Sequence, residues 1–77
     1  MATLIPFREL KTGETYFEQF ISGTDCITCK VLNRIDDTHV HMRYGVVCPW
    51  TMDTREDAQF RYWDAMPSEE QKQAAWE

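Results

Sequence analysis

The feature that most constrains the fold is a pair of alternating segments, 26–35 and 38–48, separated by Asp36 and Asp37. In both segments nearly every second side chain is apolar, which is the period of a β-strand with one face on a core. Two adjacent aspartates between such segments favour a tight chain reversal. The pattern therefore predicts an antiparallel β-hairpin over residues 26–48.

The two faces of this predicted hairpin differ in polarity. The apolar face, which we assign to the core, holds Ile27, Cys29, Val31, Ile35, Val40, Met42, Tyr44, Val46 and Cys48. The opposite face holds Cys26, Thr28, Lys30, Leu32, Arg34, Thr38, His39, His41 and Arg43. Cys29 and Cys48 are thus expected to act as small core hydrophobes, and the opposite face is expected to be modestly basic.

This hairpin also contains every cysteine and histidine of the chain, which raises the question of a metal or redox site. Of the possible ligands, only Cys26, His39 and His41 share a face. A tight reversal places Arg34 opposite His39 and Leu32 opposite His41, so Cys26 lies several residues beyond both histidines. We therefore expect no metal site. We also expect no redox-active thiol pair, because a strand lacks the helix N-terminus that lowers a thiol pKa.

Residues 14–21, ETYFEQFI, precede the hairpin and predict another strand. Tyr16 and Phe20 would lie on one face of this strand, and Phe17 and Ile21 on the other. Apolar side chains on both faces indicate a strand that is covered on both sides.

The segment 53–67 supports two interpretations. Two spacings that resemble helix capping boxes, the first beginning at Asp53, predict a helix that ends at Pro67. The stretch 58–63 also alternates well enough to form a strand, and that alternative stays open.

A second, shorter helix is predicted over residues 69–77. Ser68 and Gln71 have the spacing of a capping box, and the helix is too short to persist without packing. Trp76 is the residue expected to anchor it.

The stretch PFRELKTGETYF, residues 6–17, resembles the openings of small SH3-like barrel proteins encoded by phages and prophages. The residues that carry the resemblance are Phe7, Leu10, Gly13, Glu14 and Phe17. The resemblance covers roughly the first quarter of the chain and implies a compact non-enzymatic module that binds a host or virion protein.

These elements predict a single α+β domain over residues 1–77. Its expected architecture is a small curled antiparallel sheet of three or four strands with helical C-terminal segments. The alternative is an SH3-like five-stranded barrel with one terminal helix.

The net charge of the 77-residue chain is −5, and the excess of acid lies mostly after residue 52. Residues 53–77 hold three Lys/Arg against seven Asp/Glu, which favours a basic protein partner over nucleic acid. The sequence shows neither an apolar stretch of membrane-spanning length nor a signal-peptide pattern. Three cysteines without a disulfide framework are typical of a reducing compartment, so the expected location is the cytoplasm.

The predicted function is a small non-enzymatic protein-interaction module of phage type, which binds and occludes a larger host complex. No cofactor is expected, and the oligomeric state is left open. The predicted partner-binding residues form an acidic and aromatic set: Glu56, Asp57, Asp64, Glu69, Glu70, Trp50 and Trp63. The alternative function is nucleic-acid binding by the basic residues Lys30, Arg34, His39, His41 and Arg43.

Overall fold

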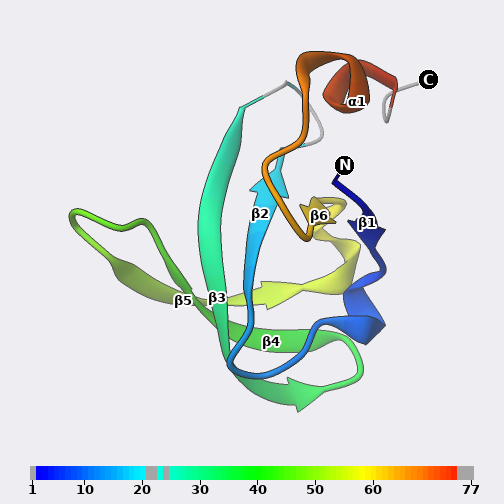
Figure 1. Cartoon of the computed structure of the whole chain (residues 1–77). Coiled ribbons are helices and arrows are strands. Elements are labelled where there is room, and N and C mark those ends of the chain that lie inside the picture. The colour runs from blue at the N-terminus through cyan, green and yellow to red at the C-terminus, as the bar shows by residue number, and fades with distance from the viewer. Residues whose placement is uncertain (1, 21–22, 24, 75–77) are drawn as a thin grey trace.

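The computed structural model describes residues 2–20, 23 and 25–74. These residues form one six-stranded antiparallel sheet in the order β1-β6-β2-β3-β4-β5 (Figure 1). The strands are β1 (Leu4–Ile5), β2 (Thr15–Gln19), β3 (Cys26–Asp36), β4 (His39–Tyr44), β5 (Trp50–Arg55) and β6 (Arg61–Trp63). The helical elements are the 3-10 helices η1 (Phe7–Glu9) and η2 (Glu56–Ala58) and the α-helix α1 (Glu69–Ala74).

Both predicted architectures are wrong. The sheet has six strands rather than three or four, and α1 is the one α-helix among the described residues. The five-stranded barrel is also wrong, because the sheet is open: β1 and β5 are its two edges and do not pair with each other. The strands β1 and β6 have only two and three residues, so that edge offers little backbone for closing a barrel.

The helix predicted over residues 53–67 is absent, and this segment contains the end of β5, then η2 and β6. The cause is tertiary pairing. β5 forms an antiparallel ladder with β4, in which Met42 lies opposite Met52 and Val40 lies opposite Thr54. The burial and hydrogen bonds gained in that ladder outweigh the local helix signals.

The predicted strand over residues 14–21 is confirmed for β2, and the predicted hairpin is confirmed for β3 and β4. The predicted register of that hairpin is wrong. The pairing shifts between Val31 and Asn33 and again between Arg34 and Asp36. Because each extra residue in β3 moves the following side chains to the other face, Arg34 pairs with Val40 rather than with His39.

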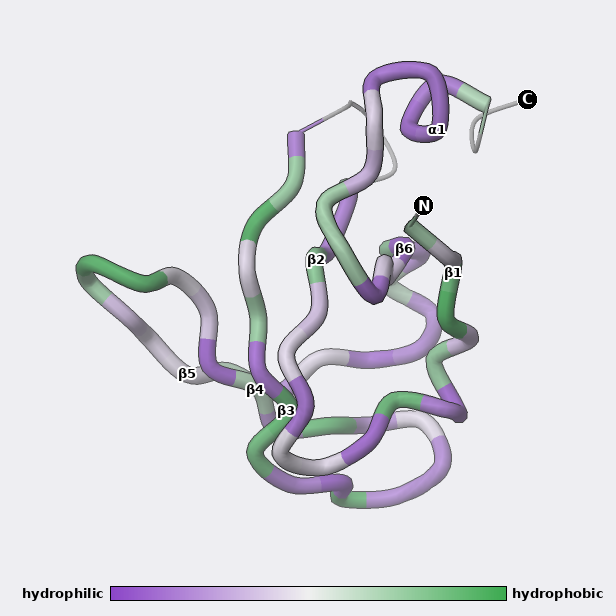
Figure 2. Tube along the Cα trace, in the orientation of Figure 1, coloured by the Kyte–Doolittle hydropathy of each residue, from purple (hydrophilic) through white to green (hydrophobic). Residues whose placement is uncertain are grey.

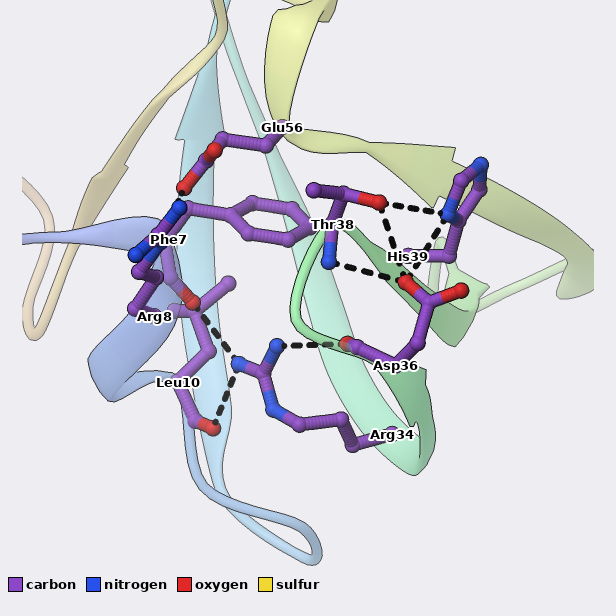
Figure 3. Close-up of polar contacts among 8 residues, drawn as sticks. All are labelled: Phe7, Arg8, Leu10, Arg34, Asp36, Thr38, His39 and Glu56. Atoms are coloured by element: carbon purple, nitrogen blue, oxygen red, sulfur yellow. Dashed lines mark hydrogen bonds and ion pairs between the residues drawn. The ribbon is translucent and has the colours of Figure 1, made fainter.

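Arg34 consequently lies against η1, on the face of the sheet that carries the core (Figure 3). Its Nη2 donates to the carbonyl oxygens of Phe7 at 2.8 Å and Leu10 at 3.3 Å. The guanidinium also lies 5.6 Å from the centre of the Phe7 ring, a cation–π arrangement. A residue predicted to be part of a basic outer face therefore holds the N-terminal segment on the core.

The core lies on the inner, concave face of the sheet. Its buried members come from four strands and from the η1 region: Phe7, Leu10, Tyr16, Cys29, Val31, Val40, Met42, Tyr44 and Tyr62. Three predicted core residues, Ile35, Val46 and Cys48, are exposed. For Val46 and Cys48 the reason is that β4 ends at Tyr44, where Gly45 takes a φ of +80° and the chain turns away from the core.

The other face of the sheet is covered near its β2–β6 side by the C-terminal segment. The Trp63 indole nitrogen donates to Gln19 Oε1 at 2.8 Å, and Gln19 Nε2 donates to the Lys72 carbonyl in α1 at 3.1 Å. The predicted capping box is confirmed, since Ser68 and Gln71 exchange side-chain hydrogen bonds to each other's backbone N–H. The anchor predicted at Trp76 lies outside the described residues.

Strand β5 leaves hydrogen-bonding groups unpaired at its outer edge in the described part of the chain. The Glu56 N–H donates to the Thr38 carbonyl, so these two residues form a hydrogen-bonded pair. Such pairs occur at every second residue of an antiparallel ladder, and the next residue of β5 whose backbone bonds to β4 is therefore Thr54. The N–H and C=O groups of Thr51, Asp53 and Arg55 therefore point away from the sheet. No helix among the described residues has the length and apolar character needed to cross a membrane.

We expect Arg34→Ala to lower the free energy of unfolding by about 2 kcal/mol, because it removes charged hydrogen bonds to three carbonyls, those of Phe7, Leu10 and Asp36, and the contact with the Phe7 ring. Urea denaturation followed by fluorescence measures this. The matched control is Arg43→Ala, since Arg43 is exposed and lies opposite Lys30; its change should stay within about 0.5 kcal/mol. Equal losses in the two variants would contradict the role given to Arg34.

Candidate functional site

The most exposed apolar side chains lie at the tip of the β4–β5 hairpin. Val46 is 75% exposed and Val47 is 92% exposed. The hairpin projects from the rest of the sheet, and its tip forms a hydrophobic stretch (Figure 2). Apolar side chains held out in water on a projecting hairpin are typical of a contact surface.

An aromatic pocket lies on the inner face beside this hairpin. Its volume is about 220 Å³, which suits one side chain better than a drug-sized ligand. The pocket is lined by residues of β2 to β5 and of the segments that flank β2 and β6: Glu18, Phe20, Ile27, Tyr44, Trp50, Met52 and Phe60. Three of these, Phe20, Trp50 and Met52, are between 39% and 48% exposed.

Two aromatic pairs form opposite parts of the pocket wall. The rings of Phe20 and Phe60 are tilted, with centres 5.4 Å apart, and the rings of Tyr44 and Trp50 are stacked at 5.7 Å. Gly45 permits the second pair, because a Cβ at that position would lie 3.1 Å from Trp50 Cζ3. Packing between the rings of each pair thus positions these side chains in the absence of a ligand.

A buried carboxyl group lies at this pocket. Glu18 is only 2% exposed, and the Tyr44 hydroxyl donates to its Oε2 at 2.7 Å. The same hydroxyl also hydrogen-bonds the buried Thr54 Oγ1. The Tyr62 hydroxyl is buried beside the carboxyl but makes no hydrogen bond of good geometry.

Burial raises the pKa of Glu18 above its ordinary value of 4.5, and the hydroxyls of Tyr44 and Tyr62 oppose this rise only in part. In the described part of the chain, none of the ion pairs includes Glu18. A carboxyl buried with hydroxyl partners and without a cation is unusual in a small domain. Such groups are concentrated at functional sites.

The structure does not join the predicted basic residues into one strip. Lys30 and Arg43 lie opposite each other in the ladder and line a cavity of about 320 Å³ on the outer side of the sheet. Arg34 points to the inner side. The two histidines have acidic partners: Nδ1 of His39 lies 3.0 Å from Asp36 and Nδ1 of His41 lies 2.7 Å from Asp53. Two neighbouring cations are few for a nucleic-acid surface.

The predicted acidic residues are spread along the chain rather than gathered at the pocket. Glu56 and Asp57 lie in η2, Asp64 follows β6, and Glu69 and Glu70 begin α1. Four of them contact groups of the chain itself: Glu56 with Arg8, Asp57 with Arg55, Asp64 with the Thr3 N–H, and Glu69 with Lys72.

The two predicted tryptophans have different environments. Trp63 is 4% exposed and belongs to the interior, whereas Trp50 is 48% exposed and lines the aromatic pocket. Trp50 is therefore the predicted site residue that coincides with the pocket. Sequence reasoning missed Glu18, Phe20, Met52 and Phe60 as pocket residues. A signal was present at Glu18, which alternates between Tyr16 and Phe20 on the apolar face of β2.

The described residues bring no three His, Cys, Asp or Glu side chains together in a way that could hold a metal ion. Cys26 pairs with Gln19 in the β2–β3 ladder. His39 and His41 lie in β4, opposite the far end of β3 from Cys26. Their partners there are Asp36 and Asp53.

Comparisons of this chain with protein-family models, with curated proteins and with solved structures give no match. The resemblance of residues 6–17 to small phage-encoded SH3-like proteins therefore stays a prediction. The pocket and the hairpin tip must be interpreted from their own geometry.

We expect Glu18→Gln to change the pH dependence of stability. Because the folded pKa of Glu18 is raised, its contribution is fully present below about pH 4.5 and is lost as the pH rises through the folded pKa. Glutamine stays neutral, so the variant should gain stability relative to the native chain across that window, by at most about 1.4 kcal/mol per pH unit. Urea unfolding between pH 4 and pH 8 measures the difference.

The control for this experiment is Glu14→Gln, which removes an exposed carboxylate just before β2. A difference between Glu18→Gln and the native chain that stays constant over the whole pH range would contradict the uncompensated burial of Glu18.

We expect the three thiols to react with iodoacetamide in the order Cys48, Cys26, Cys29. Cys48 is exposed, Cys26 is half-buried and Cys29 is buried. Burial also raises the pKa of Cys29 to about 12, which leaves almost no thiolate at neutral pH. Mass spectrometry of timed samples gives the order, and unfolding in urea should make all three react alike. Rapid modification of Cys29 in the folded chain would contradict its place in the core.

Proposed function

We propose that this protein is a small binding module that engages a basic protein partner through the aromatic pocket and the apolar tip of the β4–β5 hairpin. The single observation that carries the proposal is the adjacency of these two features. Trp50 and Met52 of β5 line the pocket, and Val46 and Val47 lie in the loop of the same hairpin.

The chemistry of the surface supports this choice. Aromatic side chains in a preformed pocket are the usual centres of binding energy at protein interfaces, and Trp and Tyr are prominent among them. The pocket is too small for a large substrate, which favours one anchoring side chain of a partner. The net charge of −5 favours a partner of opposite charge by steering its approach.

The mode of action we propose is occlusion. A projecting hairpin can enter a recess of a larger protein while the pocket holds one of the partner's side chains. The protein would then block whatever that surface of the partner normally binds.

The experiment is a pull-down from the native host with the tagged chain and three variants. Val47→Asp places a charge on the hairpin tip, and Met52→Lys places a positive charge at the pocket that would repel a basic partner; each should reduce recovery of a stoichiometric partner at least tenfold. Ile35→Asp is the matched control, because Ile35 is 50% exposed at the far end of β3. It should recover the partner normally.

A partner retained by both Val47→Asp and Met52→Lys would contradict the proposed surface. Equal loss with Ile35→Asp would contradict it as well, since the effect would then not depend on position. Circular dichroism of each variant establishes that the fold is intact before the comparison is made.

A further inference from the structure

Beneath the wall of the aromatic pocket lies a carboxyl group that has no cationic partner in the described part of the chain. Glu18 is almost fully buried, and the polar side chains that face it from every neighbouring strand are neutral at pH 7. They are the hydroxyls of Tyr44, Thr54 and Tyr62 and the thiol of Cys29. Removing a carboxylate from water without a cation is costly. The position therefore favours a ligand that brings a positive charge.

The walls of the pocket have the complementary property. Four aromatic rings, those of Phe20, Tyr44, Trp50 and Phe60, line it together with Glu18. The face of an aromatic ring carries partial negative charge and attracts cations, most strongly where water is excluded. Rings and carboxyl thus favour the same kind of group.

We propose that the aromatic pocket binds the side chain of a lysine on the partner protein, with the ammonium group held against the aromatic rings and attracted by the Glu18 carboxyl buried beneath them. This inference rests on the proposed function and names the side chain that the pocket receives. The lysine stem would lie along Ile27 and Met52, and the ammonium would lie against the rings, close to the buried Glu18.

Other occupants fit less well. A leucine or methionine would fill the apolar wall but leave the carboxyl without a charged partner. An arginine presents five donors in a rigid fork, whereas one oxygen of Glu18 already accepts a hydrogen bond from Tyr44. The lysine ammonium is compact and its stem is apolar and unbranched, which suits a pocket of about 220 Å³.

The probes for the test are N-acetyl-lysine methylamide and N-acetyl-norleucine methylamide, which has an unbranched apolar side chain and lacks the ammonium group. NMR titration of the purified, labelled chain follows the Trp50 indole and the backbone amides of the pocket residues. We expect the lysine probe to bind about tenfold more tightly than the norleucine probe. Its affinity should fall at acidic pH, as Glu18 takes up a proton.

Three variants separate a charge effect from a change of shape. Glu18→Gln keeps an acceptor for Tyr44 and removes the charge, so it should lose the preference for lysine and keep the weak norleucine binding. Trp50→Leu should weaken the lysine probe while leaving Glu18 in place. Asp53→Asn removes an exposed carboxylate from the outer face of β5 and should bind both probes as the native chain does.

The inference is overturned if norleucine binds as tightly as lysine, or if lysine binding survives Glu18→Gln unchanged. These outcomes are independent of the pull-down. Loss of the partner with Val47→Asp together with equal binding of the two probes would retain the docking surface and reject the lysine. Binding of the lysine probe that depends on Glu18 supports the inference even where the hairpin tip proves irrelevant to the partner.

Discussion

The hydrogen bond from the Tyr44 hydroxyl to the Glu18 carboxyl joins two strands that are not neighbours. Glu18 lies in β2 and Tyr44 in β4, with β3 between them. The long tyrosine side chain reaches across the intervening strand, and the twist of the sheet helps to bring the two groups together on that face. The hydrogen bond to Thr54 extends the connection to β5. Glu18 and Tyr44 both line the aromatic pocket, so the polar contact between them links two parts of its wall.

A second constraint is the irregularity of β3. This strand has eleven residues and two register shifts against β4. Bulges bend a strand and increase its twist, which suits a central strand of a twisted sheet. They also decide which face each later side chain occupies. Arg34 is thereby placed where it donates hydrogen bonds to the carbonyls of Phe7 and Leu10. Of the predicted lysine and arginine residues, only Lys30 and Arg43 remain on the outer face.

Alternation was sufficient to predict the hairpin, and capping spacings were sufficient to predict the cap of α1, because each depends on neighbours in the sequence. The strand β2 was predicted from apolar side chains on both of its faces. Bulges are not visible in a binary pattern, so the face of Arg34 could not be predicted. The segment 53–67 was misjudged because its strand residues pair with distant strands, the end of β5 with β4 and β6 with β1 and β2, and local propensity does not encode such contacts. Glu18 was overlooked for a related reason: a single acidic residue in a strand ordinarily marks a solvent-facing position.

The unpaired edge of β5 has a consequence for how copies of this chain meet. An exposed strand edge is a template for another strand of the same sequence. Two β5 edges would use all three outward-pointing residues in the antiparallel register centred on Asp53, with Thr51 opposite Arg55. That register sets one Asp53 carboxylate directly against the other, and like charges in facing positions are unfavourable. Asp53 thus disfavours this register of self-pairing, while the edge stays compatible with a strand of different sequence.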